Sequence, residues 1–190
     1  MLVIAISASI SAFSQISSAQ DFKPVSQDIL NNPDPEDWLM WRGSYENWGY
    51  SPLTEINQDN VDQLRLAWSW EFAPAAPGSN GMQVEPTVYD GVIYIRHSNE
   101  KYSAHNAATG DLIWQYSRTL AAEVAGYETR LTVHRGRGVF IYEDKLISHS
   151  TDGMLFALNP RDGSLIWEVA MQDFRSGQQP SGAPVAYGGS

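Results

Sequence analysis

Hydrophobic and polar positions alternate along most of this chain in short stretches, and turn-forming residues separate the stretches. Alternation with a period of two is typical of β-strands that bury one face. The predicted strands are residues 66–72, 87–89, 92–95, 102–105, 112–116, 138–142, 146–149, 154–158 and 165–169. No long segment carries apolar residues at the 3.6-residue spacing of an amphipathic helix. The pattern therefore predicts an all-β fold.

Turn signals divide the later strands into two groups of four. Asp90-Gly91 lies between the first two strands of one group, and an Asp-Gly pair is a strong hairpin signal. Gly110 and Gly163 precede the last strand of each group, where glycine tolerates the positive φ of a tight turn. Residues 87–116 and 138–169 are therefore each expected to form a four-stranded antiparallel sheet.

The turns before the last strands belong to a longer internal repeat. Residues 104–114 return as residues 157–167, 53 positions later, with Ala, Asn, Gly, Leu-Ile and a final Trp in matched places. A period near 50 residues with turn residues and a terminal Trp is typical of a β-propeller blade. One blade cannot bury both of its faces, so each blade needs a neighbour. Trp114 and Trp167 are expected to be core residues that pack against the next blade, because indole is large and mostly apolar.

The first part of the chain is less regular. Residues 1–19 are apolar and end in the small residues Ser17-Ser18-Ala19, which predicts a signal peptide. A buried strand or a misplaced start codon is the alternative for that segment. Residues 20–36 are polar and are expected to form a flexible lead-in, whereas residues 57–64 are expected to form one short helix with Asn57 as its N-cap.

Composition narrows the chemistry. The 190 residues carry a formal net charge of -10, which argues against nucleic acid and anionic membranes as partners. The chain has no cysteine, so neither a disulfide nor a thiolate metal site can form. There is no glycine-rich phosphate loop and no nucleophile elbow. The histidines lack the spacing of a helical zinc site; they are His97, His105, His134 and His149.

The repeated motif Ala-x-Asn-x-x-Thr-Gly-x-x-x-Trp resembles the tryptophan-docking repeat of the quinoprotein alcohol dehydrogenases. Residues 37–64 resemble the N-terminal region of that family, and residues 86–94 resemble its first blade hairpin. The resemblance implies an incomplete β-propeller domain over residues 37–190, with about two four-stranded blades of an eight-bladed propeller that binds pyrroloquinoline quinone (PQQ). Non-enzymatic outer-membrane assembly scaffolds share the docking repeat, but the N-terminal region and the hairpin point more narrowly to the dehydrogenases.

The resemblance places a first candidate cofactor residue just before the first hairpin. The family has a glutamate that contacts PQQ seven residues before the Asp of the Asp-Gly turn, and counting back from Asp90 gives Gln83. Glutamine keeps a hydrogen-bonding carbonyl and adds a donor, but it loses the charge. Glu85 is the alternative in a shifted register. An ordinary solvated residue at the start of a strand remains the plain interpretation of Gln83.

Two further candidates follow from the same resemblance. Arg137 matches a family arginine that engages a PQQ carboxylate, which a guanidinium binds by two parallel hydrogen bonds. Arg135 is the competing register, and a rim arginine is the plain alternative. Ser181 precedes Gly-Ala-Pro and matches a hydroxyl that contacts a cofactor carboxylate, with a simple turn as its alternative. Many relatives have two adjacent cysteines where this chain has Leu131-Thr132.

The implied function is that of an N-terminal part of a periplasmic, PQQ-dependent alcohol dehydrogenase. In the family, hydride passes from an alcohol to PQQ and electrons pass to a cytochrome c. The ligands for Ca²⁺ or a lanthanide and the catalytic Asp map beyond Ser190, so the piece alone is expected to be inactive. The alternative is a non-catalytic propeller-repeat scaffold of the cell envelope. In either case, about two blades are expected to leave the docking tryptophans exposed and to associate with the rest of a propeller.

Overall fold

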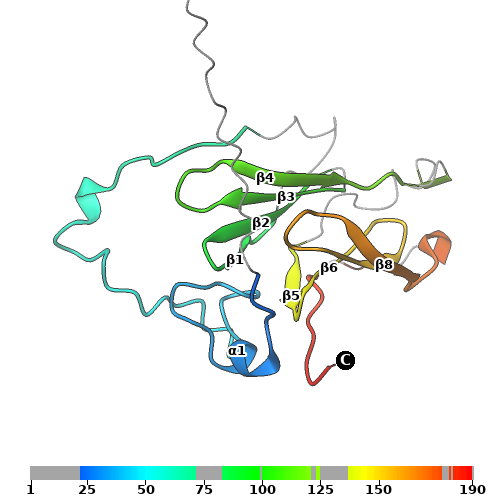
Figure 1. The fold of residues 1–190 in the computed structure, drawn as a ribbon, viewed down its shortest axis with the longest axis horizontal. Coiled ribbons are helices and arrows are strands. Elements are labelled where there is room, and N and C mark those ends of the chain that lie inside the picture. Colours follow the sequence, from blue (N-terminus) through cyan, green and yellow to red (C-terminus); the bar gives the residue numbers. More distant parts are fainter. Residues whose placement is uncertain are drawn as a thin grey trace, which may run out of the picture.

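The computed structural model describes residues 22–71, 83–98, 100–120, 123–124, 137–176, 180 and 182–189. Its body consists of two four-stranded antiparallel sheets standing side by side (Figure 1). The strands follow chain order: β1 (Thr87–Tyr89), β2 (Val92–His97), β3 (Lys101–Asn106) and β4 (Leu112–Ser117), then β5 (Phe140–Tyr142), β6 (Lys145–His149), β7 (Met154–Leu158) and β8 (Leu165–Ala170). The all-β prediction and the two expected blades are confirmed.

Aromatic side chains fill the space between the sheets. The rings of Tyr102 on β3 and Phe156 on β7 meet edge to face with their centroids 5.4 Å apart, and both side chains are fully buried. Short helices lie outside the sheets: α1 (Gln27–Asn31), η1 (Val61–Gln63) and η3 (Phe174–Ser176). No helix among the described residues has the length and apolarity to cross a membrane.

Both sheets use the repeated motif in the same way. Asn106 Oδ1 accepts hydrogen bonds from two amides of the turn at 2.9 and 3.0 Å, and Asn159 Oδ1 accepts one at 3.0 Å. The chain then passes through Gly110 at a φ of 78° and Gly163 at 72°. These are left-handed conformations in which only glycine is unstrained. The Asn and the Gly of the repeat therefore close the same turn before β4 and β8.

Trp114 on β4 docks onto the second sheet. Its indole Nε1 donates to the carbonyl oxygen of Pro160 at 2.8 Å, and the residue is 7% exposed. A Cβ on Gly163 would lie 2.5 Å from the indole, so the turn glycine also makes room for the ring. Packing of Trp114 against the next blade is confirmed, and the expectation that it would be exposed is wrong. Trp167, its counterpart on β8, is only half-buried.

A third tryptophan docks in the same way, and the repeat did not predict it. Trp68 donates from Nε1 to the carbonyl oxygen of Ala107 at 2.9 Å, and a Cβ on Gly110 would lie 2.7 Å from its ring. Ala107 and Gly110 are the counterparts of Pro160 and Gly163 in the first sheet. The strand predicted for residues 66–72 is wrong for residues 66–71, because they are extended but pair with no strand among the described residues.

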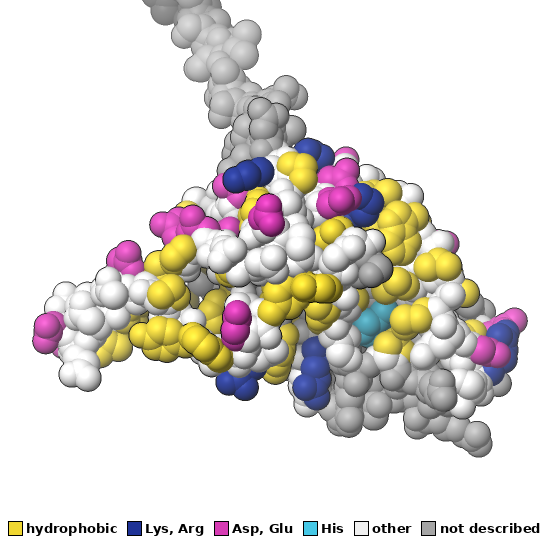
Figure 2. Space-filling view, turned by 90° about the horizontal axis from the view of Figure 1, so that it is seen from below, with side chains coloured by type: hydrophobic (Ala, Val, Ile, Leu, Met, Phe, Trp, Pro, Cys, Tyr) yellow, Lys and Arg dark blue, Asp and Glu magenta, His cyan; other side chains and the backbone are white. Residues whose placement is uncertain are grey.

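The residues before Trp68 form an extended arm that leaves the body (Figure 1). Figure 2 shows hydrophobic side chains along this arm; Trp48 and Tyr50 are both 76% exposed and Leu66 is 84% exposed. The helix predicted for residues 57–64 shrinks to the three residues of η1, and Asn60 rather than Asn57 stands at its N-cap. No apolar face of that segment is buried, so nothing stabilises a longer helix.

Residues 22–36 correct the expectation of a flexible lead-in. Val25 exchanges two backbone hydrogen bonds with Glu143 in the β5–β6 turn, at 2.9 and 2.8 Å. Ser26 caps α1, and Leu30 on that helix is fully buried, as is Val25. Two buried aliphatic residues in a polar stretch are enough to fix the segment on the body. The predicted signal peptide, residues 1–19, lies outside the described residues.

Candidate cofactor-binding site

The candidate cofactor residues belong to three segments that meet at the edge of the two sheets. Gln83 and Arg137 lie just before β1 and β5, the first strand of each sheet, and both are exposed. Ser181 lies outside the described residues, but its neighbour Gly182 is described. The first two segments touch, because Glu85 N donates to the carbonyl oxygen of Arg137 at 3.2 Å. The third segment joins them at Gly138.

Gly138 is the point of contact among these segments. It adopts a φ of 148°, and a Cβ there would lie 3.0 Å from the carbonyl oxygen of Glu85 and 3.9 Å from Cβ of Ala183. Thr87 adds a hydrogen bond from Oγ1 to the carbonyl oxygen of Val139 at 2.9 Å. The close approach requires a glycine at this position, so the Arg-Gly-Val sequence has a structural reason. Arg137 is thereby brought beside residues 182–185.

A cavity of about 280 Å³ opens beside Arg137. Its walls are the arginine, the aromatic ring of Trp41, the amide-bearing Asn47, and the segment Gly182 to Val185; Met40, Val139 and Phe140 complete the lining. Arg137 has no ion-pair partner among the residues that the structure describes. A guanidinium without an ion-pair partner among those residues, in a cavity that an indole also lines, suits a flat anionic ligand.

Gln83 and Glu85, the two alternatives for the first cofactor residue, differ in their contacts. The Glu85 carboxylate accepts hydrogen bonds from Trp38 Nε1 and from the backbone amide of Arg42, at 2.9 Å for the latter. Trp38 is itself paired with Val88 of β1 through two backbone hydrogen bonds of 2.8 and 2.9 Å. Glu85 thus fastens the N-terminal segment to the first sheet. Gln83 makes no such contact among the described residues, and its role as a cofactor residue stays a prediction.

A larger cavity of about 530 Å³ has the opposite electrostatic character. Asp34, Glu36, Asp37 and Asp90 line it, together with Lys23 and Tyr89. Burial raises the pKa of the Asp37 carboxyl, and the neighbouring carboxylates add to that rise. The surplus of negative charge disfavours an anionic ligand there. Of these two cavities, the one beside Arg137 is therefore the candidate for an anionic cofactor.

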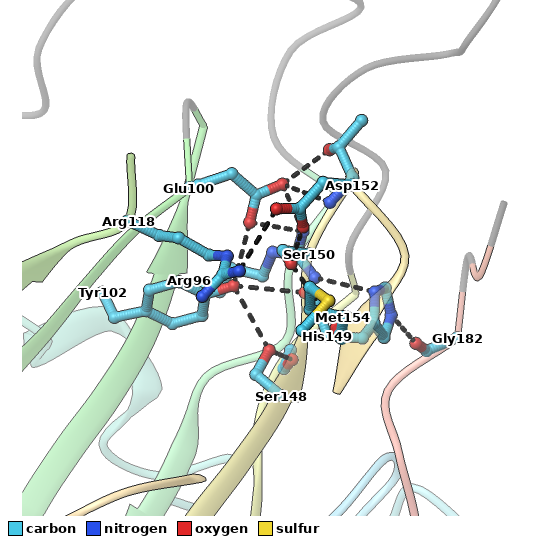
Figure 3. Close-up of polar contacts among 12 residues, drawn as sticks. Arg96, Glu100, Tyr102, Arg118, Ser148, His149, Ser150, Asp152, Met154 and Gly182 are labelled. Atoms are coloured by element: carbon cyan, nitrogen blue, oxygen red, sulfur yellow. Dashed lines mark hydrogen bonds and ion pairs between the residues drawn. The ribbon is translucent and has the colours of Figure 1, made fainter. Parts of the chain in front are cut away.

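A buried polar cluster joins the two sheets beside this edge (Figure 3). Arg96 on β2 donates from Nη2 to both carboxylate oxygens of Glu100, at 3.1 and 3.2 Å, and both side chains are at most 4% exposed. Glu100 also accepts from Thr151 of the second sheet, at 3.0 Å from its amide and 2.6 Å from its hydroxyl. Tyr102 Oη donates to the same carboxylate at 3.1 Å. A buried charge so fully paired holds the sheets in one register.

His149, at the end of β6, extends the cluster toward the cavity. Its Nε2 lies 2.6 Å from the carbonyl oxygen of Gly182, and its Nδ1 lies 3.5 Å from Arg96 Nη1. Burial lowers the pKa of the imidazole to about 4, and the charge on Arg96 acts in the same direction. Burial likewise lowers the pKa of His97, at the end of β2, to about 4. Both rings are therefore neutral at pH 7.

Sequence reasoning missed this cluster. Arg96, Glu100 and His149 stand in no recognised motif. The only signal is that Arg96 and His149 are titratable residues inside strands with a buried pattern, whereas Glu100 lies in the turn before β3. Ser150 and Asp152 lie in a turn, in which the amide of Gly153 donates to the carbonyl oxygen of Ser150 at 3.0 Å. No group of three His, Asp or Glu side chains among the described residues is arranged to hold a metal ion.

Comparisons with known proteins agree with this architecture. A family model described as the β-propeller domain of PQQ glucose/ethanol/alcohol dehydrogenases matches residues 38–174. The chain is 34% identical over 139 residues to the dehydrogenase subunit of alcohol dehydrogenase (quinone) from Gluconobacter oxydans, covering 73% of this chain and 18% of the relative. It is 33% identical over 136 residues to quinoprotein ethanol dehydrogenase from Pseudomonas aeruginosa, covering 72% and 21%.

Solved structures extend the likeness to the fold. A quinohemoprotein alcohol dehydrogenase from Pseudomonas putida HK5 superposes with a TM-score of 0.75 at 27% identity, over 88% of this chain and 24% of that one. A europium-containing methanol dehydrogenase gives 0.70 at 25% identity, over 84% and 28%. The chain thus spans about a fifth to a quarter of the length of these relatives. Since the family model covers most of the sequence and the fold agrees with it, the chain belongs to the PQQ family of glucose, ethanol and alcohol dehydrogenase β-propeller domains.

Proposed function

We propose that this chain forms the first blades of a periplasmic PQQ-dependent alcohol dehydrogenase and contributes one wall of its cofactor site. The observation that carries the proposal is the convergence of the segments containing Gln83, Arg137 and Gly182 at one edge. The cavity there contains a guanidinium that has no ion-pair partner among the described residues. Named relatives of this chain are quinone-type alcohol dehydrogenases, which supports an alcohol as the substrate.

The residues present fit PQQ, which is a flat ring system with three carboxylates. Arg137 would bind one carboxylate by paired hydrogen bonds, and Ser181 would donate its hydroxyl to another. The Trp41 ring would cover an apolar part of the ring system. Gln83 would place its amide at the rim, where it can both donate and accept. When bound, PQQ supplies a quinone that accepts hydride from the alcohol.

The rest of the propeller supplies the other walls in this proposal. A volume of 280 Å³ lies just below the range of about 300–1,000 Å³ that ligand pockets have, which suits a site completed by further blades. The ligands of Ca²⁺ or a lanthanide, together with the catalytic Asp, belong to those blades, and so does the contact with a cytochrome c that takes the electrons. Export rests on residues 1–19. The 190-residue chain alone is therefore expected to bind PQQ without oxidising alcohols.

A titration of the purified chain with PQQ tests the proposal, with binding followed by quenching of tryptophan fluorescence. Replacing Arg137 by methionine removes a charge-assisted pair of hydrogen bonds worth about 1.5–3 kcal/mol, so the affinity should fall about 10- to 100-fold. The matched control is Arg161→Met, because that exposed guanidinium lies over the Phe22 ring, outside the cavity.

The outcomes separate the two functional classes. Weaker binding in Arg137→Met, with Arg161→Met unchanged, supports the cofactor site. A chain that binds no PQQ, or an Arg137→Met variant that binds as tightly as the original, contradicts it and favours the scaffold interpretation. Alcohol-dependent dye reduction by the chain with PQQ and Ca²⁺ would contradict the expectation that this piece is inactive.

A further inference from the structure

His149 links the buried cluster to the wall of the Arg137 cavity (Figure 3). The residue is 4% exposed and lies between Gly182 and Arg96. A carbonyl oxygen can only accept and a guanidinium can only donate, so Nε2 carries the hydrogen and Nδ1 presents its lone pair to Arg96. Both neighbours therefore select one tautomer of a neutral ring, and that tautomer donates to Gly182.

The imidazole is held from behind by groups of both sheets. Arg96 is fixed by its two hydrogen bonds to Glu100, and Glu100 is fixed by the amide and hydroxyl of Thr151. Tyr102 Oη, which donates to Glu100 at 3.1 Å, also lies 3.3 Å from the carbonyl oxygen of His149. Because each of these partners is buried, the ring has little freedom to turn. Its hydrogen bond to Gly182 therefore fixes residues 182–185 relative to the two sheets.

The segment 182–185 depends on side chains of other elements for its place. His149 holds its first carbonyl oxygen at 2.6 Å, and Tyr45 Oη donates to the carbonyl oxygen of Ala186 at 2.7 Å just beyond its end. The residues between these two anchors line the cavity together with Arg137. No backbone ladder ties residues 182–187 to a strand among the residues that the structure describes. Loss of either anchor would therefore let the wall move.

We propose that His149 is a positioning residue for the cofactor cavity: its Nε2–H holds the wall of residues 182–185 at the separation from Arg137 that a flat polycarboxylate needs. This inference rests on the proposed function for the identity of the ligand, but the positioning itself is a property of this chain. The low pKa of His149 agrees with it, since the ring stays neutral and keeps the same donor throughout the neutral range. Protonation would place a second hydrogen toward Arg96.

The experiment compares His149→Leu with His149→Gln in the 190-residue chain. Leucine removes the donor, whereas glutamine keeps an N–H group near the place of Nε2. The matched control is His105→Leu, because His105 is also buried and one of its ring nitrogens, Nδ1, also lies near a glycine carbonyl oxygen, at 3.2 Å from Gly110 O, outside the cavity. The first readout is the backbone ¹⁵N order parameters of Gly182, Ala183 and Val185, and the second is the dissociation constant for PQQ.

In His149→Leu the order parameters of the wall should fall from about 0.85 toward 0.6 or below, and the affinity for PQQ should fall at least about tenfold. His149→Gln should restore both, and His105→Leu should change neither. An ordered wall in His149→Leu, or an equal effect of His105→Leu, would overturn the inference. If the wall loosens as expected but the original chain binds no PQQ, the proposed function fails and the positioning role stands.

Discussion

The two sheets share one local design but differ in what each docks against. Both run four antiparallel strands in chain order, and both break register at the same place, between Ala104 and His105 and between Ala157 and Leu158. Yet Trp114 of the first sheet is 7% exposed, whereas its counterpart Trp167 is half-buried. The difference shows that the repeat encodes a docking residue, and that the neighbouring sheet decides whether it docks.

The polar groups differ between the sheets in a complementary way. The first sheet contributes the buried charges of Arg96 and Glu100, and the second sheet receives them with Thr151 and His149. An ion pair of this kind is tolerated only when each partner is fully hydrogen-bonded. The interface between blades is therefore asymmetric. The first sheet supplies the tryptophan and the ion pair, and the second sheet supplies the glycine turn and the groups that hydrogen-bond to them.

The difference between the two sheets is tested most directly by replacing each docking tryptophan in turn. Trp114→Ala should lower the free energy of unfolding by about 3–5 kcal/mol, because a buried indole and its hydrogen bond to Pro160 are lost. Trp167→Ala should cost roughly 1 kcal/mol or less, since its ring is partly in water. Urea unfolding followed by circular dichroism measures both. Equal losses would mean that the two docking positions are not different.

Lowering the pH should reduce the stability of the folded chain through His149, the buried histidine of the second sheet. The pKa of His149 is about 4 in the folded chain against 6.5 ordinarily, so the unfolded chain binds a proton that the folded chain does not. Stability is then complete above pH 6.5 and is lost as the pH falls toward 4, by roughly 2 kcal/mol between pH 7.5 and pH 5. His149→Leu should remove this part of the pH dependence, since only Arg96 and Glu100 among the described charged groups act on the ring.

Urea unfolding at a series of pH values, with the original chain and His149→Leu measured in parallel, provides the test. The carboxylates that titrate below pH 5 affect both proteins alike, so the difference between the two curves isolates the imidazole. Parallel curves would mean that His149 has an ordinary pKa in the folded chain.

A smaller difference in stability, between alanine variants of two turn glycines, distinguishes the cost of backbone strain from the cost of disturbing the docked tryptophan. Gly91 and Gly163 have the same φ of 72°, but a Cβ meets nothing within 4 Å at Gly91, whereas at Gly163 it lies 2.5 Å from the Trp114 ring. Replacing either by alanine adds the cost of a left-handed conformation. Gly163→Ala should cost about 1–2 kcal/mol more than Gly91→Ala, because the indole must shift. The measurement is again urea unfolding, and equal costs would show that the ring yields freely.

The strands and their turns were predictable because their causes are local. Period-two alternation and the Asp90-Gly91 pair locate the hairpin, and the observed strands match the predicted ones to within about two residues at their ends. The prediction of a strand over residues 66–71 was wrong because a β-strand needs a partner strand to hydrogen-bond with, and alternation within one segment does not show whether a partner is present. Residues 22–36 were misjudged because Val25 and Leu30 are isolated apolar positions whose burial depends on Glu143 and its neighbours far along the chain.

The candidate site was predictable only in part. Gln83 and Arg137 came from a resemblance, and the contact between their segments comes from the fold. His149 stands in no motif, and its contacts are with Arg96, 53 residues earlier, and with Gly182, 33 residues later, which spacing along the sequence does not reveal. Their roles toward a cofactor stay predictions until PQQ binding is measured.

The amino-acid sequence alone determined the strands, the hairpin turns and the docking motif, because hydrogen bonds within a turn and alternation along a strand involve residues close in the chain. Only the tertiary structure decided which tryptophan is buried, which cavity lies beside an arginine that has no ion-pair partner among the described residues, and which histidine contacts the Gly182 carbonyl oxygen. Those properties depend on desolvation and on partners that the chain brings together from distant positions, and spacing along the sequence does not record them.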